Sequence, residues 1–296
     1  MDAFWIILTG SLVAITCGLL GCYLILRKMA MVGDAISHSV LPGIVIAYLI
    51  SGSRDSTIML IAAAITGVIT TFMIEFLNKQ GKLQSDASIG VTFTWLFAVG
   101  VILISVFAGK IDLDQDCVLY GEIAYIPLDS WITGSGMNLG PVAVYVIGFV
   151  LIAVVIFILS GYKELYLTTF DPAFASAIGI SVSLWHYLLM TMVSITTVAS
   201  FELVGAILVI AFLIAPPATA YLLTDNFPKM LVYTIVIAIL SSISGYYLAV
   251  FLNGSISGAM SATAGLLFAL AFLFSPKEGI VVKKLKYGFQ QKSATL

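Results

Sequence analysis

The sequence predicts an all-α integral membrane protein, a polytopic bundle of eight to nine transmembrane helices. Of its 296 residues, 61% are hydrophobic and 9% are charged, whereas soluble domains are about 45–50% apolar and about 25% charged. So few charged residues cannot cover a water-facing surface, which excludes a soluble enzyme. The net charge of −2 argues against a nucleic-acid partner, because phosphate binding requires a concentrated basic face. We therefore expect lipid to surround the chain.

A helix that crosses a bilayer needs about 20 mostly apolar residues, since each adds 1.5 Å towards about 30 Å of hydrocarbon. The second candidate segment is short for a full crossing, so eight crossings with a re-entrant piece stay open. The first segment is longer than a signal-peptide core, so we expect it to be retained. The segments form one transmembrane domain, residues 1–296: Phe4–Leu26, Ile36–Ile50, Ile58–Leu77, Ile89–Ala108, Pro141–Ser160, Leu184–Ser200, Leu203–Leu223, Leu231–Leu252 and Gly258–Phe274.

Basic residues fall almost entirely on one side of a nine-span arrangement, and positive loops face the cytoplasm. The other side carries only Arg54 and Lys110, next to several acidic residues. This split predicts an N-terminus outside the cell and a cytoplasmic C-terminal tail, residues 275–296. The basic side holds Arg27, Lys28, Lys79, Lys82, Lys163, Lys229 and the lysines of the tail.

Two connections are longer than simple linkers. The outer loop, residues 109–140, is acidic and contains Cys117, whose role stays open, and Ile123–Leu128, which could form a short helix against the bundle. In the cytoplasmic loop, residues 161–183, Asp171 is a candidate N-cap, Pro172 suits the first helical position and Gly179 suits a helix stop. A helix over residues 172–178 is too short to be stable in water alone, so it should dock on something.

The most informative pair of polar residues is Asp34 and His38, four positions apart and therefore on one face of a helix. Gly33 precedes the pair and Pro42 and Gly43 follow it. These residues should break the helix on both sides, as in membrane proteins where backbone lines a cavity. A carboxylate and an imidazole suit a divalent manganese, iron or zinc ion. The alternative is a helix cap and an interhelical hydrogen bond. Two ligands are too few for a closed site, so a second copy, backbone carbonyls or water would have to complete it.

The remaining polar features favour structural roles. His186 stands beside aromatic residues and is interpreted as an interfacial belt residue, and Glu75 can snorkel from its span. Glu202 lies between two predicted spans, where it either lines an entrance or is solvated. Pro216 and Pro217 interrupt a span and free two carbonyls, which suits a kink at a gate or a packed bend.

The chain contains no GxxxxGK[ST] phosphate-binding loop, no Gx[ST]xG nucleophile elbow and no HExxH metal-binding helix. We therefore predict that it is not an enzyme and needs no cofactor. Energy for uphill transport must come from a partner ATPase or from an ion gradient.

Several motifs resemble those of the metal-type ABC transporter permeases, the membrane subunits of bacterial manganese, zinc and iron importers. The specific motif is the run from Gly33 to Gly43, GDAISHSVLPG. One departure is Ser261–Gly265, where many members have a Pro-Thr-Gly-Pro-like turn. The resemblance covers nearly the whole chain and extends to Ser85–Gly90, Phe170–Ala175, Ile178–Ile180, Val204–Val209 and Ala215–Ala220.

The resemblance implies three protein partners: a separate ATP-binding cassette ATPase, an extracellular solute-binding protein, and a second permease copy, identical or a close paralogue, sharing a central pathway. It implies that Asp34 and His38 bind the metal, in a bacterial plasma membrane. The acidic outer loop looks most like that of manganese-importing members. The residues implied to couple to the ATPase are Asp171, Pro172, Ala173, Ala175, Ile178 and Gly179, with the face of Ala175 a candidate for a groove on the ATPase.

The favoured hypothesis is the translocation subunit of a manganese ABC importer, with zinc or iron as the nearest alternatives. An ion-coupled secondary transporter would require more acidic residues inside the spans than this sequence has. A purely structural membrane subunit would leave the spacing of Asp34 and His38 without a purpose.

Overall fold

The computed structural model describes residues 2–52, 56–107, 123–132, 138–275 and 279. Cys117 and most of the outer loop and C-terminal tail lie outside these residues. The described elements are almost all helical. In chain order they are α1 (Asp2–Leu26), α2 (Val32–Ser39), α3 (Leu41–Ser51), α4 (Ser56–Lys79), α5 (Ser85–Phe107), the 3₁₀ helix η1 (Ile123–Leu128), β1 (Ser130–Ile132), β2 (Asn138–Pro141), α7 (Val142–Ser160), α8 (Tyr162–Phe170), α9 (Pro172–Ala177), α10 (Val182–Val204), α11 (Ala206–Leu223), α12 (Phe227–Leu252) and α13 (Ile256–Phe274).

Nine segments of the described chain are long and apolar enough to cross a membrane, and they coincide with the nine predicted spans. The second consists of α2 and α3 together, residues Val32–Ser51, which are 20 residues long. The segment that seemed short from its sequence therefore has the length of a full crossing, because the helix begins before its apolar part.

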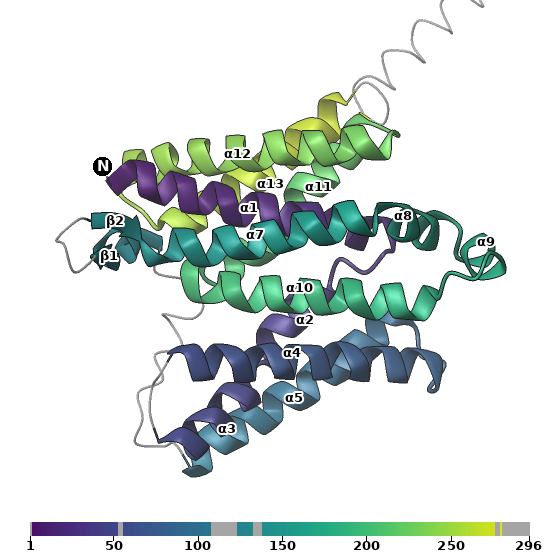
Figure 1. Ribbon diagram of the computed structural model, residues 1–296. Coiled ribbons are helices and arrows are strands. Elements are labelled where there is room, and N and C mark those ends of the chain that lie inside the picture. Colours follow the sequence, from purple (N-terminus) through teal and green to yellow (C-terminus); the bar gives the residue numbers. More distant parts are fainter. Residues whose placement is uncertain (1, 53–55, 108–122, 133–137, 276–278, 280–296) are drawn as a thin grey trace, which may run out of the picture.

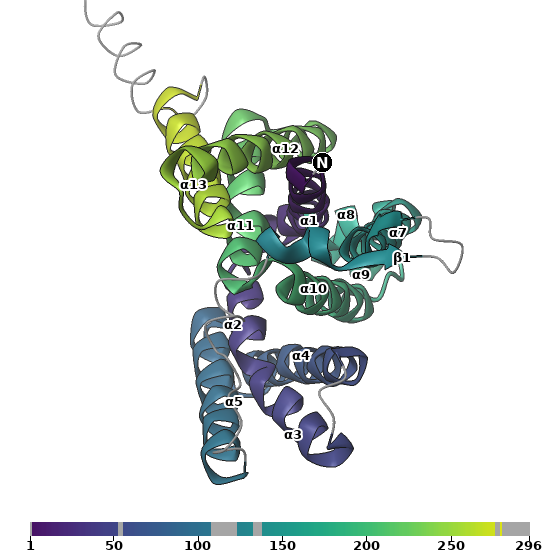
Figure 2. The ribbon, with the colours of Figure 1, turned by 90° about the vertical axis from the view of Figure 1, so that its left-hand side faces the viewer.

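The helices form two groups that meet along α2, α4 and α10. In one group, α1 packs against α7, α11 and α12, and α13 packs against α11 and α12. The other group contains α3, α4 and α5, and α2 lies between the groups with contacts to α4, α5, α10 and α11 (Figures 1 and 2). Contacts between α4 and α10 supply the largest direct junction between the two groups.

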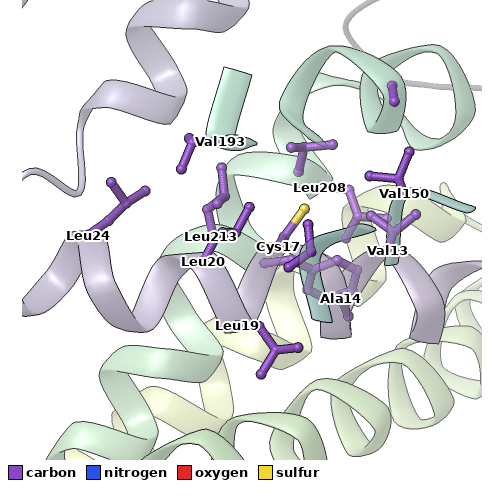
Figure 3. Packing of buried hydrophobic residues seen from close by; sticks show 14 of the residues in the cluster. Val13, Ala14, Cys17, Leu19, Leu20, Leu24, Val150, Val193, Leu208 and Leu213 are labelled. Carbon is purple, nitrogen blue, oxygen red and sulfur yellow. The ribbon is translucent and has the colours of Figure 1, made fainter. Parts of the chain in front are cut away.

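Helix α1 lies at the centre of the larger group and is buried on most sides. Val13, Cys17, Leu20 and Leu24 are fully buried against side chains such as Leu208 (Figure 3). Cys17 and Cys22 are both buried and make no disulfide with each other. The lipid-facing helices keep large apolar side chains on their outer surfaces, as expected for a chain whose solvent is hydrocarbon.

The two prolines of α11 lie inside the helix, and both are buried. Pro217 has no N–H to donate to the carbonyl of Leu213, and Gly21 of α1 lies against that carbonyl. A Cβ added at Gly21 would be 2.0 Å from the Leu213 carbonyl oxygen and 2.9 Å from Pro217 Cγ. The interruption in α11 is thus filled by another helix, which supports the packed bend rather than an open gate.

The end of the bundle opposite α9 carries η1 and a small antiparallel β-hairpin made by β1 and β2. The short helix expected over Ile123–Leu128 is confirmed as η1, and its Ile123 and Ile126 are buried against the bundle. The hairpin was not predicted, because its strands are only three and four residues long and carry too little periodicity to be recognised.

Candidate metal site

Asp34 and His38 lie on α2 and face the same side of it, as their spacing predicts. His38 Nε2 is 3.5 Å from Asp34 Oδ1, and the two side chains are 38% and 30% exposed, respectively. Both polar groups are therefore close enough to contact one ion and accessible from outside the chain. The cap interpretation of Asp34 is not supported, since the N-cap position of α2 is Met31, which has no side-chain cap hydrogen bond.

The helix that bears this pair is interrupted where Pro42 predicts it. Helix α2 ends at Ser39 and α3 begins at Leu41, because Pro42 cannot donate to the carbonyl four residues earlier. Gly43 allows close packing there: a Cβ on it would lie 2.9 Å from the Ala62 carbonyl oxygen of α4. Gly33, by contrast, is buried within the first turn of α2 and does not break the helix.

Two phenylalanines of α5 line one side of the His38 imidazole. The ring centroids of Phe93 and Phe97 lie 6.1 and 5.9 Å from that of His38, and the Phe97 ring meets the imidazole edge-on at 81°. Sequence reasoning missed both residues. Their spacing of one helical turn is the only signal, and it does not distinguish these rings from ordinary lipid-facing ones.

No third candidate ligand of these types joins Asp34 and His38 within the described residues. In that part of the chain, no group of three or more His, Cys, Asp or Glu side chains could hold a metal ion. The described part of one chain thus provides two side-chain donors of these kinds. A complete coordination shell needs further ligands beyond this pair.

The short helix predicted in the 161–183 loop is α9, Pro172–Ala177. Asp171 caps it by accepting a hydrogen bond from the Phe174 N–H at 2.9 Å, and Gly179 has a positive φ of 88° just after its end, as its role as a stop requires. The helix follows α8 and packs against α8 and α10. It lies at the tip of the bundle (Figure 1).

The exposed face of α9 differs from the one expected. Ala175 is fully buried and cannot enter a groove on another protein, because α9 turns this side towards its own chain. Phe174 and Ile178 are instead 52% and 51% exposed. Spacing within so short a helix could not decide which side faced the bundle.

Two other residues also differ from expectation. His186 is not a simple belt residue: its ring joins Glu75 of α4 to Arg27 after α1. Glu202 does not lie in a linker, because α10 continues to Val204 and places it in the last helical turn, where it is exposed.

Comparison with known proteins places these features in context. Residues 3–275 match the ABC 3 transport family. The manganese transport system membrane protein MntD of Bacillus subtilis is 51% identical, over 97% of this chain and 97% of that protein. The zinc transport system membrane protein TroD of Treponema pallidum is 45% identical over 93% of this chain and 75% of that protein. Among solved structures, PsaBC from Streptococcus pneumoniae in complex with Fab has a chain with a TM-score of 0.76 and 30% identity, covering 95% of this chain and 94% of that one.

Proposed function

This chain belongs to the ABC 3 transport family, and we propose that it is the membrane-spanning permease subunit of an ABC importer that brings manganese into the cytoplasm. Relatives named as manganese transport membrane proteins support this cargo. Membership of the family also decides against the ion-coupled secondary transporter that the sequence alone left open. Zinc and iron stay alternatives, with less support than manganese.

The observation that carries the proposal is the pair formed by Asp34 and His38. Ionisable groups inside a membrane span are costly and mark ion pathways. Here the two groups share one helix face, 3.5 Å apart and partly exposed, just before the break between α2 and α3 at Val40. We propose that this pair holds the metal ion during its passage. The ion would enter with part of its water shell, exchange some waters for the carboxylate and imidazole, and leave by regaining them.

A second permease copy completes the proposed site. Two donors from one chain are too few to replace the water shell of a divalent ion. A twofold axis beside α2 would bring together two carboxylates and two imidazoles. The exposure of both side chains in the single chain supports this arrangement, because donors that face outwards are available to a partner. The chain would thus form half of a pathway shared between two copies.

Metal selectivity need not be built into this pair alone. Aspartate and histidine bind zinc more strongly than manganese in nearly any geometry. We propose that discrimination lies mainly in the extracellular solute-binding protein that delivers the ion. The permease would then accept whichever divalent ion is presented to it.

Energy is proposed to arrive through α9 from a separate ATPase subunit. The chain has no phosphate-binding loop, and family membership is consistent with a subunit that is not itself an enzyme. The exposed apolar side chains of Phe174 on α9 and of Ile178, directly after it, are suited to a groove on the ATPase. We propose that Asp171 and Gly179 keep the short helix formed between subunits.

The proposed orientation places the α9 end of the bundle in the bacterial cytoplasm and the hairpin end outside. Basic residues support it, since Arg27, Lys79, Lys163 and Lys229 all lie at the α9 end. The N-terminus of α1 would then be outside and the chain after α13 cytoplasmic, in a plasma membrane.

Metal uptake tests the site directly. In vesicles that contain the permease with its ATPase and binding protein, Asp34→Ala and His38→Ala should each reduce radioactive manganese uptake to background while the complex still assembles. Ser37→Ala is the matched control, because within the described residues its hydroxyl donates to the Asp34 backbone carbonyl of the same helix and to no other group. Parental uptake by both alanine variants would overturn the metal-site proposal.

A further inference from the structure

A chain of ionisable side chains crosses the bundle at its α9 end, between the two groups of helices. Arg27 Nη1 lies 3.3 Å from His186 Nδ1, His186 Nε2 lies 3.0 Å from Glu75 Oε2, and Lys79 Nζ lies 2.7 Å from Glu75 Oε1. These four residues, Arg27, His186, Glu75 and Lys79, are called the clamp below. They come from the end of α1, from α10 and from α4.

The geometry of the clamp determines which ring nitrogen of His186 carries the proton. A guanidinium group only donates hydrogen bonds. Burial lowers the pKa of Arg27 to about 10, which still leaves it protonated at neutral pH. The Nδ1 atom of His186 therefore accepts from Arg27, and its Nε2–H donates to the Glu75 carboxylate. The imidazole thus links a cation to an anion through one acceptor and one donor.

The centre of the clamp, Glu75 with His186, is largely buried, whereas Lys79 at its edge is exposed, and burial of charged groups costs free energy. Glu75 is only 8% exposed, and the His186 side chain is 13% exposed. Apolar side chains of similar size often replace buried ion pairs with equal or better stability, and charges within membrane spans are usually kept for function. Stability alone thus gives no reason for this arrangement.

On one side, the clamp is tied to the helices that hold α9. Arg27 donates from Nη2 to Thr168 Oγ1 at 2.9 Å and from Nε to Thr169 Oγ1 at 3.0 Å. Both threonines lie in the last turn of α8, which leads directly into α9. Lys79 donates to Ser183 Oγ at 2.8 Å, at the start of α10. The two helices that flank α9 (Figure 1) are therefore both bonded to clamp residues.

On the other side, the clamp is tied to the helix that carries the metal pair. Arg27 precedes α2 by only a short turn. Glu75 belongs to α4, whose Thr70 donates to Ser39 Oγ of α2 at 2.7 Å. A displacement of either Arg27 or α4 would therefore also displace α2, on which Asp34 and His38 lie.

We propose that the clamp is the link through which displacement of α9 reaches α2, with Arg27, His186 and Glu75 as positioning residues for transport. The inference rests on the proposed function, in which α9 meets the ATPase and α2 holds the metal. When α9 and α8 shift, Thr168 and Thr169 move Arg27. His186 and Glu75 then carry the shift across the junction to α4, so that both attachments of α2 move together.

The test compares two replacements of His186 in the complete complex reconstituted in vesicles. Glutamine keeps one acceptor and one donor, whereas leucine has neither. We expect His186→Leu to lower both manganese uptake and metal-stimulated ATPase activity about tenfold, within the range found for single residues in coupling networks. His186→Gln should keep at least half of both activities. Equilibrium dialysis should show that both variants bind manganese as the parent does. A defect confined to the metal site would instead lower manganese binding.

Two further variants guard against misfolding and general charge effects. If His186→Leu does not assemble, Arg27→Gln tests the same link and should separate binding from transport in the same way. Lys229→Gln removes an exposed cation at the same end of the bundle and should behave like the parent.

Three results would overturn the inference: parental coupling in the leucine variant, equal defects in the glutamine and leucine variants at equal melting temperature, or loss of metal binding together with uptake. Failure of the proposed function itself would appear elsewhere, as absence of manganese binding in the parent or parental uptake by Asp34→Ala. The two failures are thus distinguishable within one set of measurements.

Discussion

Replacement of Gly21 by alanine should destabilise the protein far more than a single methyl group usually does. The added Cβ would lie 2.0 Å from the Leu213 carbonyl oxygen and 2.9 Å from Pro217 Cγ. Neither a backbone carbonyl nor a proline ring in mid-helix can rotate away, so α1 and α11 would have to separate by about 1.5 Å to restore contact distances near 3.5 Å. Overpacking of this kind costs about 1–3 kcal/mol, and the rigid obstacles favour the upper end of that range.

Chemical unfolding in mixed micelles would measure the change in free energy of unfolding. Gly148→Ala is the matched control, because a Cβ on that helical glycine meets nothing within 4 Å, and it should leave stability unchanged or slightly higher. Gly33→Ala should fall between the two, since its Cβ would meet only the Leu213 side chain, with Cδ1 closest at 2.6 Å, and the end of that side chain can move. Equal stability of the Gly21 and Gly148 variants would refute the close contact between α1 and the interrupted part of α11.

Two further predictions concern the ends of the bundle. Phe174→Asp should abolish co-purification of the ATPase subunit and stimulated ATP hydrolysis, because it places a charge at a half-exposed apolar position on α9. The control Tyr125→Asp, exposed at the opposite end of the bundle, should leave both unchanged. If the Phe174→Asp variant binds the ATPase as the parent does, α9 is not the contact site. In a Cys117→Ser background, an impermeant thiol reagent added to intact cells should label Leu128→Cys on η1 and should reach Ser176→Cys on α9 only after the membrane is opened. The reverse labelling pattern would invert the proposed topology.

Most of what the sequence predicts correctly depends on interactions between near neighbours in the chain. The nine spans follow from runs of apolar residues, because only a helix satisfies its own backbone in hydrocarbon. The cap at Asp171 and the stop at Gly179 follow from local backbone chemistry. Asp34 and His38 could be paired because a helical turn brings positions four apart onto one face.

The tertiary structure decided which of several local possibilities each polar residue adopts. His186, Glu75 and Arg27 come from three distant parts of the sequence, and each alone is typical of an interfacial side chain. Their contact depends on how α4 packs against α10 and the end of α1. The pattern of apolar and polar residues along one helix does not predict such a contact, because in a uniformly apolar helix it does not indicate which side packs against which neighbouring helix. For the same reason, the burial of Ala175 and the filling of the α11 bend by Gly21 depend on where neighbouring helices lie.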